Sequence, residues 1–150
     1  MIRLFNTSNG EKISEVRRGS ESAVIKHLSF DWDTGSYLSC CSDKSTIHIF
    51  KTPAMTSVVN ESSEESKEVS ASGNTKSYFS ALSSVVSFAG SEWSFAQLRL
   101  EQNVQIDEFS RVTACIKDKQ VYTITSKGFF LKALIVEGGG SLAVEKTCSF

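Results

Sequence analysis

Short alternations of apolar and polar residues run through most of the chain and are separated by turn-rich stretches. In KISEV (12–16) and TIHIF (46–50), large apolar side chains occupy every second position, which is the period of a half-buried β-strand. Gly, Asn, Asp and Ser cluster between such stretches, as they do in tight turns. The pattern predicts about ten strands, at 2–5, 12–16, 23–30, 37–42, 46–50, 93–100, 111–116, 121–125, 129–136 and 142–148.

Two of the turns have a specific chemistry. Gly35, in DWDTGS, is free to take a positive φ. The tripeptide Asp43-Lys44-Ser45 separates the stretches 37–42 and 46–50, which predicts a β-hairpin. Strands joined mostly by short turns predict an all-β meander, and repeated four-stranded units would suit the blades of a β-propeller.

The alternation stops between 51 and 90. The tract 60–75 is rich in Ser and Glu and has few large apolar groups, a composition typical of a disordered segment. In 77–90 the large apolar residues recur close to the 3.6-residue period of an amphipathic helix, and the opposite face is nearly all serine. These apolar residues are Tyr78, Phe79, Leu82, Val85, Val86 and Phe88.

Composition narrows the class of protein. The chain has 150 residues, of which 40% are hydrophobic and 22% charged, enough for one modest domain with a core. Its formal net charge of −1 gives no global basic field for nucleic acid or anionic lipid, so any anion site must be local. No stretch has the length and apolarity of a signal peptide or a transmembrane helix.

The four cysteines are Cys40, Cys41, Cys115 and Cys148. Adjacent residues on a strand point to opposite faces, so Cys40 and Cys41 are expected on different sides of their sheet. No C-x-x-C or Cys/His spacing predicts a metal site. We therefore expect reduced, mostly buried thiols rather than a disulfide framework.

The predicted hairpin gathers polar groups that suit an anion. Alternation puts Thr46 and His48 on the same side of one strand, and Ser42 ends the partner strand across the turn. Two hydroxyls, an imidazole and a nearby arginine from Arg17-Arg18 suit a phosphate, because guanidinium binds phosphate oxygens in a bidentate way. A protonated His48 would add charge, and its usual pKa of about 6.5 predicts binding that favours mildly acid pH.

Each of these residues also has a structural interpretation. Adjacent arginines are most often solvated turn residues, and a single strand histidine is more often packed and hydrogen-bonded than a ligand. Serine and threonine at strand ends commonly hold turns together. The combination at this spacing, rather than any single residue, favours an anion site.

The sequences VRRG (16–19) and SDKSTIHIF (42–50) together resemble the hallmark of the PROPPIN family, seven-bladed β-propellers that bind phosphoinositides. The resemblance covers nearly the whole chain. It implies an all-β, WD40-like partial propeller of about two and a half four-stranded blades, with one long loop that carries a short amphipathic helix. The end of blade 5 would occupy 1–19, blade 6 would occupy 20–103 with its long loop at 51–91, and blade 7 would occupy 104–150.

The resemblance also assigns lipid sites. In the family the two arginines serve two separate sites on the propeller rim, so Arg17 would serve the first and Arg18 the second. Ser42, Thr46 and His48 would complete the second site. The full implied set is Arg3, Arg17, Arg18, Gly19, Ser42, Thr46 and His48, with phosphatidylinositol 3-phosphate and phosphatidylinositol 3,5-bisphosphate as expected ligands.

The family uses its blade 6 insertion as a membrane anchor, and 77–90 fits that role with its apolar stripe. The alternative is a helix packed on the protein's own surface. The acidic serine tract beside it is either a plain linker or a phosphorylation target, since added charge would repel anionic lipid.

The sequence departs from the family pattern at three points. Val16 replaces the usual Phe or Leu, and Ser45 stands where glycine usually precedes the threonine. The third departure is length, because blades 1 to 4 and most of blade 5 have no counterpart. We therefore expect a fragment of a longer chain, with strand edges and blade faces exposed.

The resemblance favours a non-catalytic, membrane-recruited scaffold in autophagy or endosomal trafficking, cytoplasmic and peripheral on preautophagosomal, endosomal or vacuolar membranes. The alternative is a WD-repeat protein–protein interaction module with vestigial or incomplete lipid sites. An enzyme is disfavoured, because His27 and His48 are the only histidines and no G-x-S-x-G elbow is present. Expected partners are phosphoinositide membranes and autophagy or lipid-transfer proteins, the latter contacting blades outside this chain. No nucleic acid, metal or cofactor is expected.

Overall fold

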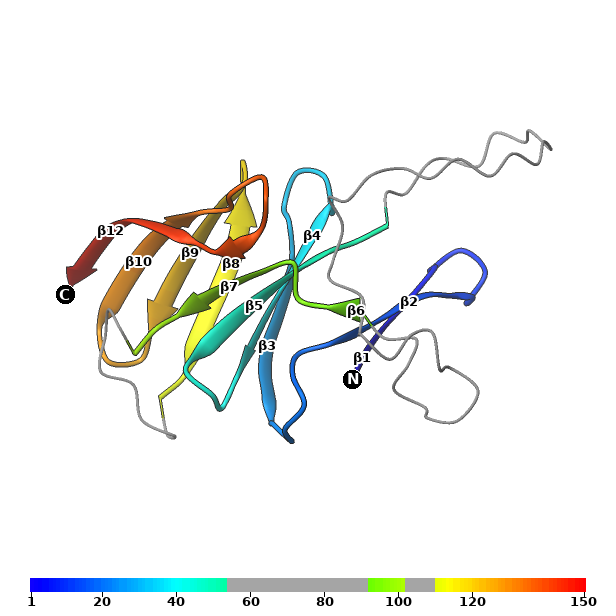
Figure 1. The fold of residues 1–150 in the computed structure, drawn as a ribbon, viewed down its shortest axis with the longest axis horizontal. Helices are drawn as coiled ribbons and strands as arrows, with labels where there is room; N and C mark the ends of the chain where they lie inside the picture. The colour runs from blue at the N-terminus through cyan, green and yellow to red at the C-terminus, as the bar shows by residue number, and fades with distance from the viewer. Residues whose placement is uncertain (54–91, 102–109) are drawn as a thin grey trace.

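A computed structural model of the chain describes residues 1–53, 92–101 and 110–150, and these residues form strands and turns (Figure 1). The strands are β1 (Ile2–Phe5), β2 (Lys12–Arg17), β3 (Ile25–Phe30), β4 (Tyr37–Ser42), β5 (Thr46–Lys51), β6 (Glu92–Trp93), β7 (Ala96–Arg99), β8 (Val112–Lys117), β9 (Gln120–Thr125), β10 (Phe129–Leu134), β11 (Gly140–Ser141) and β12 (Ala143–Ser149). None of the described residues belongs to a helix long and apolar enough to cross a membrane.

The strands form three sheets that lie side by side, with the first at the right and the third at the left of Figure 1. The first sheet has the order β1-β2-β6, the second β11-β7-β5-β4-β3, and the third β12-β10-β9-β8. In the second sheet β3, β4, β5 and β7 pair antiparallel in sequence order, and in the third sheet β8, β9, β10 and β12 do the same. This repetition of a four-stranded meander is the construction principle of a propeller.

Two short strands join neighbouring sheets. β6 pairs in parallel with β2, with Trp93 opposite Arg17, just before the chain enters β7 of the second sheet. β11 pairs in parallel with β7, with Ser141 opposite Gln97, just before the chain enters β12 of the third sheet. The outer strand of one sheet is thus hydrogen-bonded to the segment that leads into the outer strand of the next.

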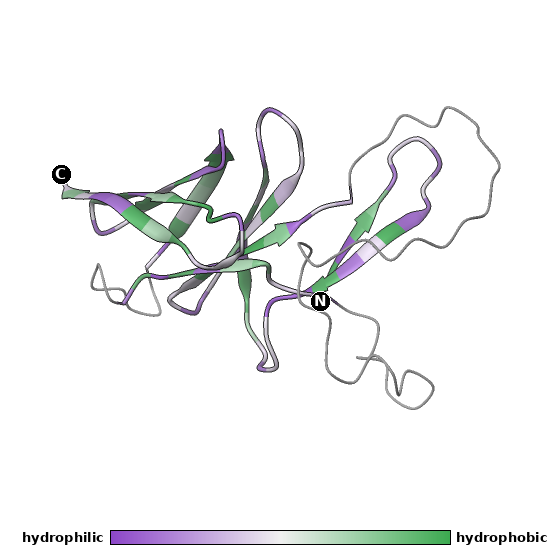
Figure 2. Cartoon of the chain, turned by 45° about the horizontal axis from the view of Figure 1, so that its top comes forward, coloured by the Kyte–Doolittle hydropathy of each residue, from purple (hydrophilic) through white to green (hydrophobic). Residues whose placement is uncertain are grey.

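Two apolar cores hold the sheets against each other. The core between the first and second sheets contains Ile2, Val16, Leu38, Cys40 and Phe50. The core between the second and third sheets contains Cys41, Ile47, Ile49, Phe95, Ala96, Leu98, Leu100, Val112, Ala114, Ile116, Val121, Leu131, Ala133, Ile135 and Leu142. Figure 2 shows apolar residues concentrated along the strands and polar residues in the turns that connect them. Burial of a large aliphatic or aromatic side chain contributes about 1.5–3 kcal/mol each, so these cores are the main source of stability.

The structure confirms the all-β propeller fold class. The hairpin around Asp43-Lys44-Ser45 is present between β4 and β5, and Gly35 has the expected positive φ of 64°. The stretch 93–100 is not one strand, because the chain leaves the ladder at Ser94 and Phe95 while it passes from the first sheet to the second. The predicted amphipathic helix at 77–90 lies outside the described residues.

The cysteine prediction is half right. Cys40 and Cys41 are buried free thiols on opposite faces of β4, one in each core. Cys115 and Cys148 are also free, but both are exposed, which contradicts the expectation of mostly buried thiols. Cys115 occupies an exposed position of β8, whose alternate residues Val112, Ala114 and Ile116 face the second sheet.

Candidate functional site

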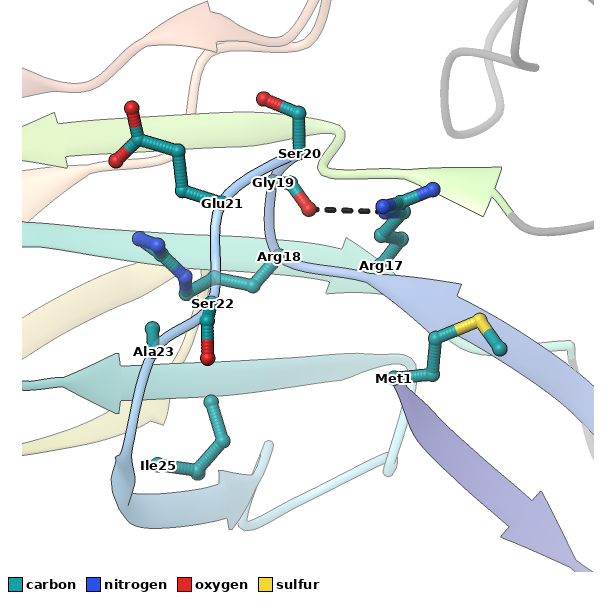
Figure 3. Close-up of a pocket in the computed structure, with 9 residues that line it drawn as sticks. All are labelled: Met1, Arg17, Arg18, Gly19, Ser20, Glu21, Ser22, Ala23 and Ile25. Carbon is teal, nitrogen blue, oxygen red and sulfur yellow. Dashed lines mark hydrogen bonds between the residues drawn. The ribbon is translucent and has the colours of Figure 1, made fainter. Parts of the chain in front are cut away.

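The turn that leaves β2 sends two arginines in opposite directions. Val16 is fully buried in the core between the first and second sheets. Because side chains alternate along a strand, Arg18 is directed to the same side as Val16 and Arg17 to the other side. Figure 3 shows the two guanidinium groups pointing away from each other across the loop that continues through Gly19.

The second sheet presents the face that Arg18 meets. Pairing of β4 with β5 puts Cys40 opposite His48 and Leu38 opposite Phe50, and the same register continued by two residues puts Ser42 opposite Thr46. Leu38, Cys40 and Phe50 belong to the core against the first sheet. The apolar face therefore ends in a polar group made of Ser42, Thr46 and His48, as the sequence predicts.

Arg18 is close to this polar group. Its positive charge lowers the pKa of His48 and opposes the rise in the pKa of Cys40, although burial is the larger cause of both shifts. No hydrogen bond or ion pair joins the half-buried Arg18 side chain to another residue that the structure describes. It lines a hollow of about 250 Å³ together with Glu21 and Ile25 (Figure 3). A cation without a carboxylate partner beside hydroxyl and imidazole groups is suited to an anionic ligand.

His48 is a buried and neutral member of the site. It is 6% exposed, its Nδ1 lies 3.1 Å from Oγ of Ser94, and its ring stacks on Phe50 with centroids 6.4 Å apart. Burial, followed by the charge of Arg18, lowers the pKa of His48 to about 4. The expectation that His48 is protonated at mildly acid pH is therefore wrong for the ligand-free chain, because the sequence does not reveal how deeply the ring is packed.

This pKa shift predicts a pH dependence of stability. Between pH of about 6.5 and about 4 the unfolded state binds a proton at His48 that the folded state does not, so the free energy of unfolding falls as the pH is lowered through this window. Replacement of His48 by glutamine should flatten this part of the profile. Urea denaturation at several pH values measures it, and an unchanged slope in His48→Gln would contradict the assignment.

The other three predicted residues lie around the opposite side of the turn. Arg17 Nε donates a hydrogen bond to the carbonyl oxygen of Gly19 at 2.9 Å. Arg3 Nε donates to Glu15 Oε2 at 2.8 Å, and the Lys12 ammonium is 3.8 Å from the same carboxylate oxygen. Arg3 is thus held by an acidic neighbour that the sequence interpretation did not consider, whereas Arg18 is not.

Gly19 is not required by the local backbone. A Cβ at this position would meet no atom within 4 Å, and the φ of Gly19 is outside the positive region. The Gly19→Ala variant should therefore fold with a free energy of unfolding within about 0.5 kcal/mol of the wild type. Urea denaturation checks this. A large loss of stability would show that the turn needs glycine, and weaker vesicle binding by a stable variant would show that a ligand approaches Gly19 closely.

The interface between the second and third sheets can be compared, position by position, with the interface between the first and second sheets that holds the candidate site. Leu98 lies opposite Ile47 as Val16 lies opposite Ile2, so Leu100 occupies the place of Arg18. The hairpin of β9 and β10 takes the place of that of β4 and β5. The positions equivalent to Ser42, Thr46 and His48 are then occupied by Thr125, Phe129 and Leu131. Leu100 and Leu131 are buried in the core. The interface between the second and third sheets is therefore apolar at the positions where the interface between the first and second sheets carries a cation and an imidazole.

Three residues near the site were missed by the sequence interpretation. In the pairing of β5 with β7, Thr46 is opposite Arg99 and His48 is opposite Gln97, so these side chains share a face. Ser94 is buried next to the His48 ring. The alternation of Gln97 and Arg99 with apolar neighbours in AQLRL was the available signal. The strand that pairs with β5 is separated from it by the long stretch 52–95, so the sequence does not reveal their register.

Two further predictions concern other parts of the chain. The proposed membrane-insertion residues, Tyr78, Phe79, Leu82, Val85, Val86 and Phe88, lie outside the described residues. Over the ranges 1–53, 92–101 and 110–150, no group of three His, Cys, Asp or Glu side chains could hold a metal ion.

Sequence relatives were found among curated proteins. The chain is 32% identical over 104 residues to SVP1-like protein 2 of Saccharomyces cerevisiae, which covers 69% of the chain and 23% of the relative. It is 47% identical over 51 residues to Autophagy-related protein 18 of Kluyveromyces marxianus, a match that covers 34% of the chain and 10% of the relative. It is 40% identical over 72 residues to Autophagy-related protein 21 of Schizosaccharomyces pombe, with 48% and 21% covered. The chain belongs to the PROPPIN family.

Solved structures agree with the fold of this PROPPIN chain. It matches KlHsv2 with loop 6CD replaced by a Gly-Ser linker at a TM-score of 0.61 and 18% identity, over 98% of this chain and 38% of that one. It matches KlAtg21 in complex with the coiled-coil of AgAtg16 at a TM-score of 0.58 and 19% identity, over 97% and 33%. No family model matches the chain. This PROPPIN chain spans less than a quarter of the length of the three curated relatives described above.

Proposed function

We propose that the chain is part of a non-catalytic scaffold that is recruited to membranes by phosphoinositides and acts in autophagy or endosomal trafficking. The observation that carries the proposal is Arg18, a half-buried guanidinium without an acidic partner among the described residues, whose charge acts on His48. The strand register puts Ser42 and Thr46 on the same face of the second sheet as His48. Membership of a family with autophagy-related relatives supports the same conclusion. The ligand class we infer is phosphatidylinositol 3-phosphate or phosphatidylinositol 3,5-bisphosphate.

The second lipid site is proposed to use Arg18, Ser42, Thr46 and His48. Arg18 would bind two phosphate oxygens through its planar guanidinium. Ser42 Oγ already accepts a hydrogen bond from the Lys44 backbone N–H at 3.2 Å, which leaves its hydroxyl hydrogen for a phosphate oxygen. Thr46 has no side-chain partner among the described residues and can donate in the same way.

The first lipid site is proposed to use Arg3, Arg17 and Gly19. Arg17 leaves the turn on the side opposite to Arg18 (Figure 3), so a headgroup bound there would be separate. Because Glu15 holds Arg3, a ligand at this site must compete with an ion pair. We therefore expect the first site to contribute less than the second in this chain.

The blade assignment remains part of the proposal. The end of blade 5 is inferred at 1–19, blade 6 at 20–103 with its loop at 51–91, and blade 7 at 104–150. The first, second and third sheets are our candidates for these three pieces. The loop would supply the membrane anchor through the apolar stripe between Tyr78 and Phe88.

Partners and location follow from the same proposal. One solved relative, KlAtg21, was determined with the coiled-coil of AgAtg16, which supports an autophagy protein as a partner here too. We infer that the contact surface for a protein partner lies largely on blades outside this chain. The expected location is cytoplasmic and peripheral, on preautophagosomal, endosomal or vacuolar membranes.

The test compares vesicle binding of matched variants. Vesicles with phosphatidylinositol 3-phosphate, or with phosphatidylinositol alone, are sedimented with wild type, Arg17→Thr/Arg18→Thr, and Lys117→Thr/Lys146→Thr. The last variant removes the same charge from exposed positions of the third sheet. We expect lipid-selective pelleting that only the double arginine variant loses. Folded wild type that ignores the phosphate would contradict the proposal and favour an interaction module.

A further inference from the structure

The loop that joins β2 to β3 carries two exposed serines beside Arg18. Ser20 and Ser22 are both exposed, and both line the hollow of about 250 Å³ that Arg18 also lines (Figure 3). Neither serine side chain makes a hydrogen bond with another residue that the structure describes. Their hydroxyl groups are therefore open to chemistry that the proposed lipid sites do not use.

The loop is held at its two ends and not between them. At its start Arg17 Nε donates to the carbonyl oxygen of Gly19, and at its end Val24 exchanges two hydrogen bonds with Asp43. No hydrogen bond joins 20–23 to another described residue, and a Cβ added at Gly19 would meet no atom within 4 Å. A short segment without such bonds can adopt the extended conformation in which an enzyme binds its substrate, at little cost to the fold.

The two serines differ in the charges that precede them. Ser20 follows Arg17-Arg18-Gly19, which contains the only pair of adjacent arginines in the chain, whereas Ser22 directly follows Glu21. Protein kinases distinguish substrates by such charge patterns, and one large class selects a serine with arginines two and three positions before it. Ser20 fits that class and Ser22 does not.

We propose that Ser20 is a phosphorylation site, and that its phosphate binds Arg18 in place of a lipid headgroup. In the transfer, Ser20 Oγ forms a bond to the γ-phosphorus of ATP, and the bond from that phosphorus to the bridging oxygen breaks. ADP leaves, and the hydroxyl proton passes to the base of the kinase. The competition with lipid rests on the proposed phosphoinositide function. The guanidinium that recruits the chain to a membrane thus also provides for its release.

The charge of a phosphate favours its pairing with Arg18. A phosphoserine carries about −1.5 to −2 charges at neutral pH and three acceptor oxygens, which suits the two-pronged hydrogen bonding of a guanidinium. Arg18 makes no hydrogen bond or ion pair with another described residue, Glu21 of the same hollow included. Arg17 points the other way across the loop (Figure 3), and its guanidinium already binds Gly19. A phosphate tethered two residues from Arg18 has a high effective concentration that a lipid headgroup must outcompete.

The first experiment tests the modification. The chain is incubated with ATP and the catalytic subunit of cyclic-AMP-dependent protein kinase, which selects basic substrates, and the phosphate is located by mass spectrometry. We expect phosphate on Ser20 in wild type and in Ser22→Ala, and none in this loop in Ser20→Ala. A folded chain that is phosphorylated elsewhere but not on Ser20, or not at all, would overturn Ser20 as a modification site.

The second experiment tests the pairing with Arg18 and needs no kinase. Phosphoserine is incorporated during translation in place of Ser20 or, as a control for charge, in place of the exposed Ser8 in the turn between β1 and β2. The second pKa of the phosphate, which is about 6 when unpaired, is measured by ³¹P titration. We expect a lowered pKa at position 20, because a nearby guanidinium favours the dianion. Arg18→Gln should restore the pKa, whereas Arg17→Gln should leave it low.

Vesicle binding then separates this inference from the function on which it rests. Phosphoserine at position 20 should weaken binding to phosphatidylinositol 3-phosphate vesicles about 10- to 100-fold, and at position 8 by less than about threefold. Unchanged binding, equal losses at the two positions, or a pKa that Arg18→Gln does not restore would each overturn the inference. A pKa lowered by Arg18 in a chain whose unmodified form ignores the phosphorylated lipid would support the pairing and overturn the proposed function.

Discussion

The Arg18→Gln variant should bind phosphatidylinositol 3-phosphate vesicles about 10- to 100-fold more weakly than wild type. A hydrogen bond to a charged group contributes about 1.5–3 kcal/mol, and each 1.4 kcal/mol corresponds to about tenfold in affinity. Arg18 makes no hydrogen bond or ion pair within the described part of the chain, so its removal leaves no buried partner behind. Vesicle titration measures the affinity, and circular dichroism shows that the fold is kept.

Two further variants control for charge. Lys117→Gln removes one positive charge from an exposed position of β8. Lys117 is remote from the site, because the carbonyl of its neighbour Ile116 lies at the end of β3 that is away from the site. We expect it to bind within about twofold of wild type, because exposed charges beyond a Debye length are screened. Glu21→Gln removes a carboxylate from the hollow that Arg18 lines and should strengthen binding. Equal losses in Arg18→Gln and Lys117→Gln would mean that binding depends on net charge alone.

The Phe50→Ala variant should lose about 3–5 kcal/mol of the free energy of unfolding. Phe50 is 0% exposed and packs in the core that holds the second sheet against the first. Its ring also stacks on His48, so the variant removes support from the candidate site as well as apolar contacts. Urea denaturation gives the free energy, and vesicle binding measured under folding conditions gives the consequence for the site.

An exposed phenylalanine provides the matched control. Phe150 is 82% exposed at the end of the described chain, and Phe150→Ala should change the free energy of unfolding by less than about 0.5 kcal/mol. The contrast between two identical substitutions isolates burial as the cause. Equal effects of the two substitutions would contradict a stabilising core between the first and second sheets.

The local parts of the fold are predictable from sequence because their determinants are local. Alternation gives 2–5 and 37–42 with the bounds that the structure has, and the turn residues 43–45 give the hairpin that aligns Thr46 and His48. The stretch 93–100 fails as one strand because its first residues pair with β2 and its last with β5. Such a change of partner depends on how the sheets are arranged, and alternation carries no information about that.

The site divides in the same way. The side from which Arg18 projects follows from alternation next to buried Val16, so the sequence predicts it. The protonation state of His48 cannot be predicted from the sequence, because its lowered pKa depends on burial by residues that are distant in sequence. The contacts of Ser94 with His48 and of Glu15 with Arg3 are likewise set by the pairing of separate strands.

The interface between the second and third sheets lacks the polar side chains of the proposed second lipid site. It has Leu100, Phe129 and Leu131 at the positions equivalent to Arg18, Thr46 and His48 in the interface between the first and second sheets. The same backbone arrangement thus serves packing between the second and third sheets and, we propose, lipid recognition between the first and second sheets. We propose that lipid recognition depends on a few side chains at the end of the interface between the first and second sheets.

The most direct test of the account maps a soluble headgroup onto the chain. Inositol 1,3-bisphosphate is titrated into ¹⁵N-labelled protein, and changes in backbone amide shifts are followed residue by residue. The account predicts saturable changes centred on Arg18, Thr46 and His48, and their loss in Arg18→Gln. Changes centred on the lysines of the third sheet, or no saturable change in a folded chain, would contradict it.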